Sequence, residues 1–320
     1  MTLTATTQDA TGTTAVRQAP SRRGTWSPRE KANLTKGLLF ISPWILGTLA
    51  FVVFPIFYSA IISLTKYSGM QSPQWQGLAN YTRMFQDPLA WTSIFNTLFY
   101  SGWAVPVGLV VSLLLALAMN RNVREVAAYR TILYLPSLAP VFALSFIFLV
   151  LVNPGTGIVN QVITLFGGQE RDFLTGNATS AKLVIVAMAQ LGAGNAALIF
   201  LAGLNNIPRT LYEAARIDGA SAAQSFFRIT MPLLTPSILF NLITGISAGL
   251  QVFTQAYIMT NGGPNNGTMF YMLYLYRNAF SYADLGYASA LAVVLFLVGV
   301  VLALLVYQVS RRFVNYEVAS

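Results

Sequence analysis

Six stretches without Asp, Glu, Lys or Arg divide this chain, and each is long enough to cross a lipid bilayer. They are residues 37–65, 88–120, 131–169, 183–208, 229–276 and 285–310. About 20 apolar residues in a helix cross the hydrocarbon core. Only 9% of the residues are charged, and the mean hydropathy is +0.59. We therefore predict an all-α membrane protein with six transmembrane helices, at about 37–63, 93–119, 131–152, 183–204, 233–258 and 286–310.

An even number of spans places both termini on one side of the membrane. Most of the 19 Lys and Arg residues lie on that side, in the two terminal segments and in the second and fourth connections, whereas the other side holds Lys66, Arg83, Arg171, Lys182 and Arg277. Because basic residues accumulate in cytoplasmic connections, we predict cytoplasmic N- and C-termini. The net charge of +9 then reflects membrane topology, and no nucleic-acid partner is expected.

Missing residue types exclude several kinds of chemistry. The chain has no Cys and no His, and no Gly-Lys pair from which a phosphate-binding loop could be built. The predicted spans contain no ionisable residue of the kind that relays ions in coupled transporters. We predict no catalytic residues, no metal site, no cofactor bound by this chain and no enzyme activity. Active transport would need energy from another polypeptide.

The first 35 residues differ in composition from the rest. They are rich in Thr and Ala and poor in large apolar side chains, so they cannot form a core of their own. We predict a disordered cytoplasmic tail at 1–35, followed by a membrane domain at 36–320.

A polar, Ala-rich segment separates the fourth and fifth predicted spans. Thr210 and Glu213 match a capping box at a helix start, and Ser221 with Gln224 forms a second match. Gly219 lies between them, where a left-handed cap or bend is easiest. The pattern predicts two short helices joined by a bend.

These two helices, at 208–231, have two interpretations from their residues alone. Their small Ala side chains would let a helix sit closely in a groove of a partner protein. Alternatively the helices rest on lipid, with Phe226 and Phe227 as anchors and Arg216 and Arg228 near head groups. Pro232 fits the first turn of the next span.

A longer pattern in this segment resembles a known family. Glu213-Ala214-Ala215, three residues, Gly219, nine residues, Ile229, one residue and Met231-Pro232 is similar to the EAA motif of ATP-binding-cassette importer permeases, EAA-x3-G-x9-I-x-L-P. Met231 departs from the usual Leu by a volume-conserving change. Stretches at 96–120, 129–140, 199–220 and 251–266 resemble the carbohydrate-importer branch (maltose, lactose and multiple-sugar type), and the resemblance runs from about residue 36 to the end.

The resemblance implies the architecture of a type I importer permease in the bacterial cytoplasmic (inner) membrane. It implies four kinds of partner: a second homologous permease, two ATP-binding subunits that hold ATP and Mg, an extracytoplasmic sugar-binding protein and the lipid bilayer. The two short helices would be coupling helices that dock on an ATPase. The residues carried over to that role are Tyr212, Glu213, Ala214, Ala215, Asp218 and Gly219.

Polar residues within the fourth and fifth spans are candidates for a substrate pathway. Amides and hydroxyls pair with uncharged sugar hydroxyls. The candidates in the middle of the fourth span are Gln190 and Asn195. Those on one stripe of the fifth span are Asn241, Thr244, Ser247, Gln251, Thr254 and Gln255, with the aromatic neighbours Phe253 and Tyr257. The alternative is hydrogen bonding between packed helices.

Other features leave alternatives open. Gly192 and Gly194 fit either close helix packing or a substrate site. Trp103 and Pro106 fit either a kink that shapes a cavity or a kink that neighbouring helices fill. Residues 261–267 are dense in turn formers and predict a loop, which by resemblance faces the binding protein. Residues 153–180 predict an external connection with a short helix bracketed by glycines.

The leading hypothesis is a permease subunit that forms, with a second permease, the pathway for a sugar or oligosaccharide. One alternative is an importer of glycerol phosphate or another polyol derivative. A substrate that bears a phosphate would need cationic side chains in the pathway, and the predicted spans contain none. A different class is a non-transporting membrane scaffold or a passive channel.

Overall fold

The computed structural model of the chain describes residues 28–121 and 124–310. It divides into two units, one ending at Pro55 and the other beginning at Ile56. The first unit contains α1 (Pro28–Thr48), a π-helical turn η1 (Leu49–Val53) and the start of α2 (Phe54–Ile62). Because α1 begins at Pro28, the end of the predicted tail is helical. The rest of that tail prediction lies outside the described residues.

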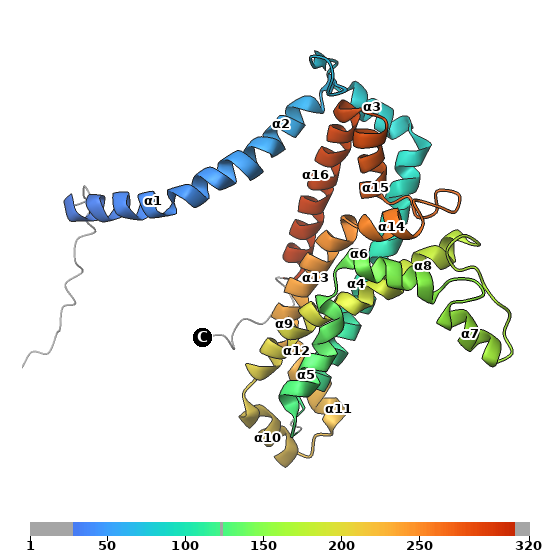
Figure 1. Cartoon of the computed structure of the whole chain (residues 1–320). Helices are drawn as coiled ribbons and strands as arrows, with labels where there is room; N and C mark the ends of the chain where they lie inside the picture. The colour runs from blue at the N-terminus through green and yellow to red at the C-terminus, as the bar shows by residue number, and fades with distance from the viewer. Residues whose placement is uncertain (1–27, 122–123, 311–320) are drawn as a thin grey trace, which may run out of the picture. The chain divides into compact units, whose positions relative to one another are not determined.

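The second unit begins within α2 and continues with a short antiparallel sheet and further helices (Figure 1). The first half contains β1 (Thr65–Lys66), β2 (Gln74–Trp75), α3 (Ala79–Gln86), α4 (Pro88–Met119), α5 (Val126–Tyr134), η2 (Leu135–Leu138), α6 (Val141–Leu151), α7 (Ile158–Leu165), α8 (Ala178–Ala189), η3 (Gln190–Gly192) and α9 (Ala193–Asn205). The second half contains α10 (Arg209–Ile217), α11 (Ala222–Ser225), η4 (Phe226–Thr230), α12 (Met231–Leu233), α13 (Thr235–Leu250), α14 (Thr254–Met259), α15 (Tyr271–Tyr276), η5 (Arg277–Ser281) and α16 (Leu285–Ser310).

Five helical stretches of the described chain are long and apolar enough to span a membrane: Ala32–Ile62, Pro88–Met119, Ala178–Asn205, Thr235–Met259 and Leu285–Ser310. The predicted third span is not one straight helix, because Val126–Leu138 and Val141–Leu151 meet at a bend of 88°. Pro140 follows the bend, and Ala139 before it is extended, with ψ 131°. A residue before proline avoids the helical region, so the sequence itself breaks this span.

The fourth span starts earlier than predicted. Since α8 begins at Ala178, Lys182 lies inside an apolar helix, and the expectation that the spans carry no ionisable residue is wrong. The Lys182 Nζ donates to Asn96 Oδ1 at 3.0 Å and lies 4.8 Å from the centre of the Phe99 ring. Asn96 in turn donates to the backbone carbonyls of Asn266 and Met269. This network fastens the 261–267 loop to α4 and α8.

The fifth span is also interrupted, because α13 ends at Leu250 and α14 begins at Thr254. After it, residues 261–267 form the predicted loop, in which Asn261 and Asn265 have positive φ angles. α15 was not predicted. The short helix expected between the glycines of the 153–180 connection is present as α7.

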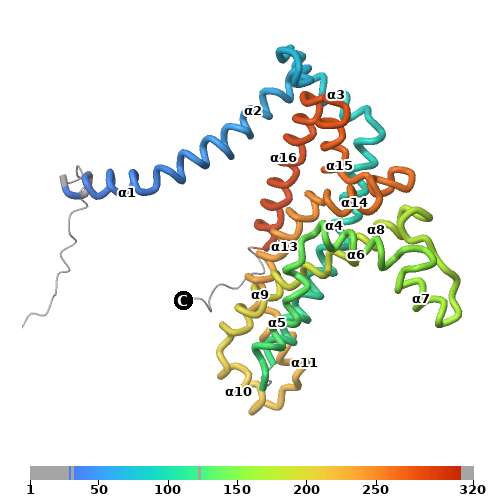
Figure 2. Tube along the Cα trace, viewed as in Figure 1, coloured from blue at the N-terminus to red at the C-terminus, as the bar shows by residue number. Residues whose placement is uncertain are grey.

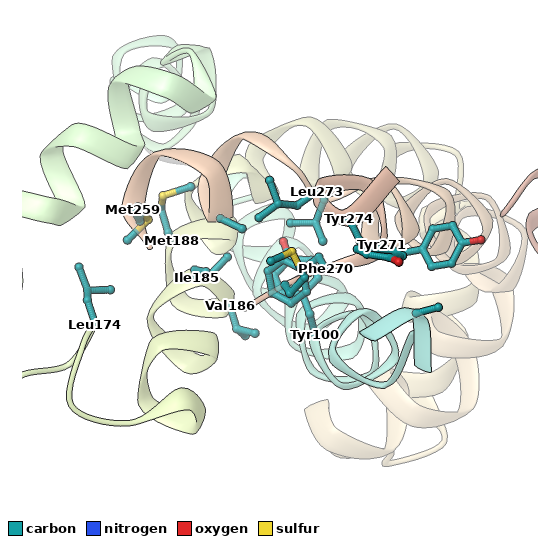
Figure 3. Close-up of a cluster of buried hydrophobic side chains, with 14 of the residues drawn as sticks. Tyr100, Leu174, Ile185, Val186, Met188, Met259, Phe270, Tyr271, Leu273 and Tyr274 are labelled. Atoms are coloured by element: carbon teal, nitrogen blue, oxygen red, sulfur yellow. The ribbon is translucent and has the colours of Figure 1, made fainter. Parts of the chain in front are cut away.

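Two buried clusters hold the second unit together. The larger one joins α4, α8, α14, α15 and α16. Figure 3 shows part of it, with Tyr100 of α4 against Phe270 at a ring separation of 5.3 Å. The smaller cluster joins α4, α9 and the start of α13 through Met119, Phe200 and Leu234.

The two ends of the second unit carry different elements (Figure 2). α10 and α11 lie at one end, and the sheet, α3 and the start of α16 lie at the other. At the α3 end Asp87 caps α4 and accepts hydrogen bonds from Tyr274 and Tyr287. Burial raises the pKa of the Asp87 carboxyl, but the hydrogen bonds from Tyr274, the Leu89 amide and Tyr287 outweigh burial and leave this pKa below its ordinary value.

Candidate functional site

A cavity of about 360 Å³ lies within the second unit, between α4, η2, the η3–α9 segment, α13 and α14. Its polar lining includes amides and hydroxyls from Ser112, Ser137, Gln190, Asn195, Asn241 and Gln255. Among the described residues, no charged side chain lines it. The cavity can therefore surround an uncharged, hydroxyl-rich molecule or part of one.

Within the described residues, the hydrogen bonds of the cavity leave one buried acceptor of its lining without a donor. Tyr134 donates its hydroxyl to Asn195 Oδ1 at 3.0 Å, and Asn241 Nδ2 donates to the Ala196 carbonyl at 3.4 Å. The Gln190 Nε2 donates to the Val186 carbonyl at 2.7 Å, but the Gln190 Oε1 is buried with no hydrogen-bond donor within the described part of the chain. An unsatisfied buried acceptor is costly, and a hydroxyl group entering the cavity would satisfy it.

Small residues create the space. A methyl group on Gly108 would lie 3.3 Å from Gln190 Oε1, and one on Gly245 would lie 3.2 Å from the Val105 side chain. A methyl group on Gly192 would meet nothing within 4 Å, although this residue lines the cavity. In the sequence Gly192 fits either a substrate site or close helix packing, whereas no local signal indicated Gly108 or Gly245, because neither interrupts its helix.

Gly194 has a packing role. A methyl group at this position would lie 2.6 Å from Ser137 Oγ and 3.1 Å from Tyr134 Cδ2, so α9 can approach η2 only with glycine here. Trp103 and Pro106 do not line the cavity. They line a separate groove along α4, and the interpretation that a kink here shapes the cavity stays a prediction.

The predicted polar stripe does not form one continuous surface. Of the stripe residues, Asn241 and Gln255 line the cavity, together with Gln190 and Asn195 of the fourth span. Ser247 and Gln251 instead line a groove between α13, α15 and α16. The prediction assumed an unbroken helix through 251–253, and the break there separates Gln255 from Ser247 and Gln251. Thr244 is exposed and donates to the Phe240 carbonyl of its own helix at 2.9 Å.

The remaining predicted pathway residues lie in α14 or directly before it. Thr254 begins this helix, and Phe253 precedes it. The rings of Phe253 and Tyr257 stack with centroids 5.4 Å apart, and Tyr276 lies 4.9 Å from Phe253. These aromatic residues therefore pack against one another and not around the cavity.

At the end that carries α10, the predicted helix pair is present. α10 ends at Ile217, and Gly219 has a φ of +75°. The Gly219 amide donates to the Arg216 carbonyl at 3.1 Å, and the Ala220 amide donates to the Ala215 carbonyl at 2.8 Å. These two bonds form a Schellman motif, which confirms the predicted bend at Gly219.

Only one of the two predicted capping boxes forms. The Ser221 side chain accepts from the Gln224 amide, and the Gln224 side chain accepts from the Ser221 amide. The Thr210–Glu213 box is wrong, because α10 begins one residue after Pro208 and has no side-chain cap. Thr210 is thus already inside the helix.

The faces of α10 differ. Tyr212 and Ala215 are half-buried and face the rest of the unit, whereas Glu213, Ala214, Asp218 and Gly219 are exposed. Asp218 follows the last residue of α10, and its amide donates to the Ala214 carbonyl. Most of the proposed coupling residues are therefore accessible to a partner.

Sequence reasoning missed Ile217. This side chain is 86% exposed and lies four residues after Glu213, so the two share one face of α10. The signal available in the sequence was a lone large aliphatic residue among polar and small ones. Single exposed apolar side chains are common on protein surfaces, and this one shares its helix face with Glu213.

A polar pocket of about 580 Å³ lies at the opposite end, between the sheet, α3 and the connection before α16. Lys66, Gln71, Gln74 and Arg83 contribute to it, and Arg83 pairs with Asp284 at 2.6 Å. This surface is suited to polar contacts with another molecule.

The family of the chain follows from its sequence. Residues 104–315 match the family model described as "Binding-protein-dependent transport system inner membrane component". The chain belongs to this family. It is a multi-pass inner-membrane permease, a non-catalytic subunit of an ABC transporter.

Individual relatives agree with this assignment. The permease is 38% identical to "Probable ABC transporter permease protein YesP" of Bacillus subtilis, over 90% of this chain and 94% of the relative. It is 35% identical to "Sulfoquinovosyl glycerol transport system permease protein SmoG" of Agrobacterium fabrum, over 81% and 85% of the two chains.

Two solved structures share the fold. One is a bacterial ABC transporter involved in the import of the acidic polysaccharide alginate, with a TM-score of 0.78 and 25% identity over 90% of this permease and all of the matched chain. The other is an alginate transporter in complex with an alginate pentasaccharide-bound periplasmic protein, with a TM-score of 0.77 and 26% identity over 88% and 96% of the two chains. The predicted permease architecture is confirmed.

Proposed function

We propose that this permease forms, with a second permease, the membrane pathway of an ATP-driven importer for a sugar or oligosaccharide. The observation that carries the proposal is the cavity, whose lining is amide and hydroxyl with no charged side chain among the described residues. Sugar hydroxyls need paired donors and acceptors without net charge. The unsatisfied Gln190 Oε1 is a ready acceptor for one of them.

The exposed face of α10 supplies the contact with the energy source. Glu213 and Ile217 project from one face, and Gly219 fixes the turn that follows. On this proposal two ATP-binding subunits hold ATP and Mg, and this face docks on one of them. Neither ATP nor Mg binds the permease itself. A helix face of one large apolar side chain beside an acidic and a small one fits a groove lined by apolar and basic groups.

An extracytoplasmic sugar-binding protein would deliver the substrate at the end that carries the polar pocket and the 261–267 loop. The structural relative crystallised with a periplasmic protein supports such a partner. The positions of the basic residues support cytoplasmic termini, because Arg130 of α5 and Arg209 and Arg216 of α10 lie on helices at the same end of the second unit.

An acidic saccharide is a second candidate substrate. The relative that imports alginate acts on an acidic polysaccharide, and Lys66 lies in the polar pocket opposite α10. The uncharged cavity lining favours a neutral sugar or a neutral part of a longer chain. Glycerol phosphate, or another polyol derivative that bears a phosphate, would require a cation that the cavity lining does not provide.

Replacing Ile217 with Asp tests the docking face. A carboxylate at the centre of an apolar contact would lose its hydration without gaining a partner, which weakens binding. We therefore expect at least tenfold less ATPase subunit to co-purify with the permease. Ile217→Leu keeps the apolar contact and is expected to retain the ATPase. The measurement is the ratio of ATPase to permease after affinity purification from membranes.

The outcome separates the transport proposal from a scaffold or channel. A second permease and an ATPase that co-purify with the unmodified chain support the importer. If neither co-purifies, the importer proposal is wrong and a scaffold or channel is favoured. If the ATPase co-purifies but Ile217→Asp retains it fully, the proposed coupling face is wrong.

A further inference from the structure

One hydrogen bond joins the proposed docking helix to the start of the fifth span. The hydroxyls of Tyr212 on α10 and Thr230 at the end of η4 lie 2.8 Å apart. Thr230 is buried, with 4% of its surface exposed. Tyr212 is the large inward-facing side chain of α10, and its ring packs against the buried cluster that contains Leu204 and Leu234.

This hydrogen bond lies on a route of contacts that leads from the docking face to the cavity. The Leu234 amide donates to the Thr230 carbonyl at 3.0 Å, and the Leu234 side chain is fully buried beside Phe200 of α9. α13 begins directly after Leu234 and carries Asn241 and Gly245 into the cavity lining. α9 carries Asn195 into the same lining.

The packing along this route is tight. A methyl group on Gly203 of α9 would lie 2.6 Å from Ser237 Oγ and 2.9 Å from the Leu234 side chain. Because close-packed interiors transmit strain, a displacement of one of these two helices is passed to the other. The π-helical turn η4, which ends at Thr230, is the irregular segment between α11 and α12. Such turns often occur at functional sites within helices.

We propose that Tyr212 and Thr230 are positioning residues, whose hydrogen bond transmits movement of α10 to α13 and α9 and so couples ATP hydrolysis to reshaping of the cavity. The inference rests on the proposed function. Without the bond, α10 can shift on the ATPase while η4 absorbs the displacement, and the cavity helices stay in place. ATP is then hydrolysed with less sugar moved.

The test measures ATP hydrolysis and sugar uptake in the same vesicles, with the complete transporter reconstituted with its binding protein. For Tyr212→Phe and for Thr230→Val, we expect normal co-purification of the ATPase and an approximately fivefold fall in sugar molecules moved per ATP. The double variant should equal the single variants, because all three lack the same bond. Thr230→Ser keeps the hydroxyl and should restore the normal ratio.

Tyr129→Phe is the matched control, since this α5 tyrosine is exposed and its hydroxyl has no hydrogen-bond partner among the described residues. It should leave the ratio unchanged. An unchanged ratio in Tyr212→Phe, with the ATPase bound, overturns the inference alone, and lower protein stability without a change in ratio does the same. If the ATPase does not bind the unmodified permease, the proposed function fails and the inference fails with it.

Discussion

Replacing Gly219 with proline is expected to reduce sugar uptake by at least about tenfold while the permease still inserts into the membrane. Gly219 has a φ of +75°, and proline fixes φ near −65°. Proline also removes the amide that donates to the Arg216 carbonyl. The Schellman motif cannot form, so α10 ends differently and its exposed face no longer has the orientation that the ATPase would meet. A tenfold effect corresponds to only about 1.4 kcal/mol of coupling.

Gly219→Asn is the matched control, because asparagine adopts the left-handed conformation at lower cost than other side chains. A methyl group at Gly219 meets nothing within 4 Å, so the asparagine side chain has space. We expect uptake within about twofold of the unmodified permease. Equal uptake by the proline and asparagine variants would show that the turn has no role in coupling.

Replacing Gly192 with phenylalanine is expected to block transport by filling the cavity. A benzene ring needs roughly 150 Å³, which is a large part of the 360 Å³ available. Because a side chain at Gly192 begins in open space, the fold should tolerate it. We expect at least a tenfold loss of uptake, with normal expression and normal binding of the ATPase. The measurement is initial uptake of labelled sugar into membrane vesicles.

Gly102→Phe provides the control for Gly192→Phe. Gly102 lies in α4, where an added methyl group would also meet nothing within 4 Å, and it lines the separate groove beside Trp103 and Pro106. Uptake by this variant should remain near normal when the second permease still co-purifies. Full transport by Gly192→Phe would place the substrate pathway elsewhere.

Local features of the 208–231 segment were predictable because their chemistry depends on near neighbours. Gly219 and the Ser221–Gln224 box follow from backbone requirements within a few residues. The predicted Thr210–Glu213 box was wrong for an equally local reason, because Pro208 precedes a helix that begins at Arg209, one residue before Thr210. Ile217 shows that exposure of an apolar side chain depends on which face the folded unit covers, which motif spacing does not indicate.

The cavity depended on contacts between distant segments and was predicted only in part. Gln190 and Asn195 stood out as polar residues in an apolar span, and the structure places both in the lining. The predicted stripe on the fifth span required one continuous helix, but the helix breaks after Leu250 and the residues beyond the break point in other directions than predicted. Gly108 and Ser137 come from segments that meet only through tertiary packing, so no local pattern indicated them.

The most direct measurement is uptake of a labelled sugar into vesicles that contain the permease, its partner permease and the ATPase. The account predicts uptake that requires both ATP and the binding protein and falls at least tenfold in Gly192→Phe. Uptake at an equal rate without ATP or without the binding protein would contradict it and favour a passive channel.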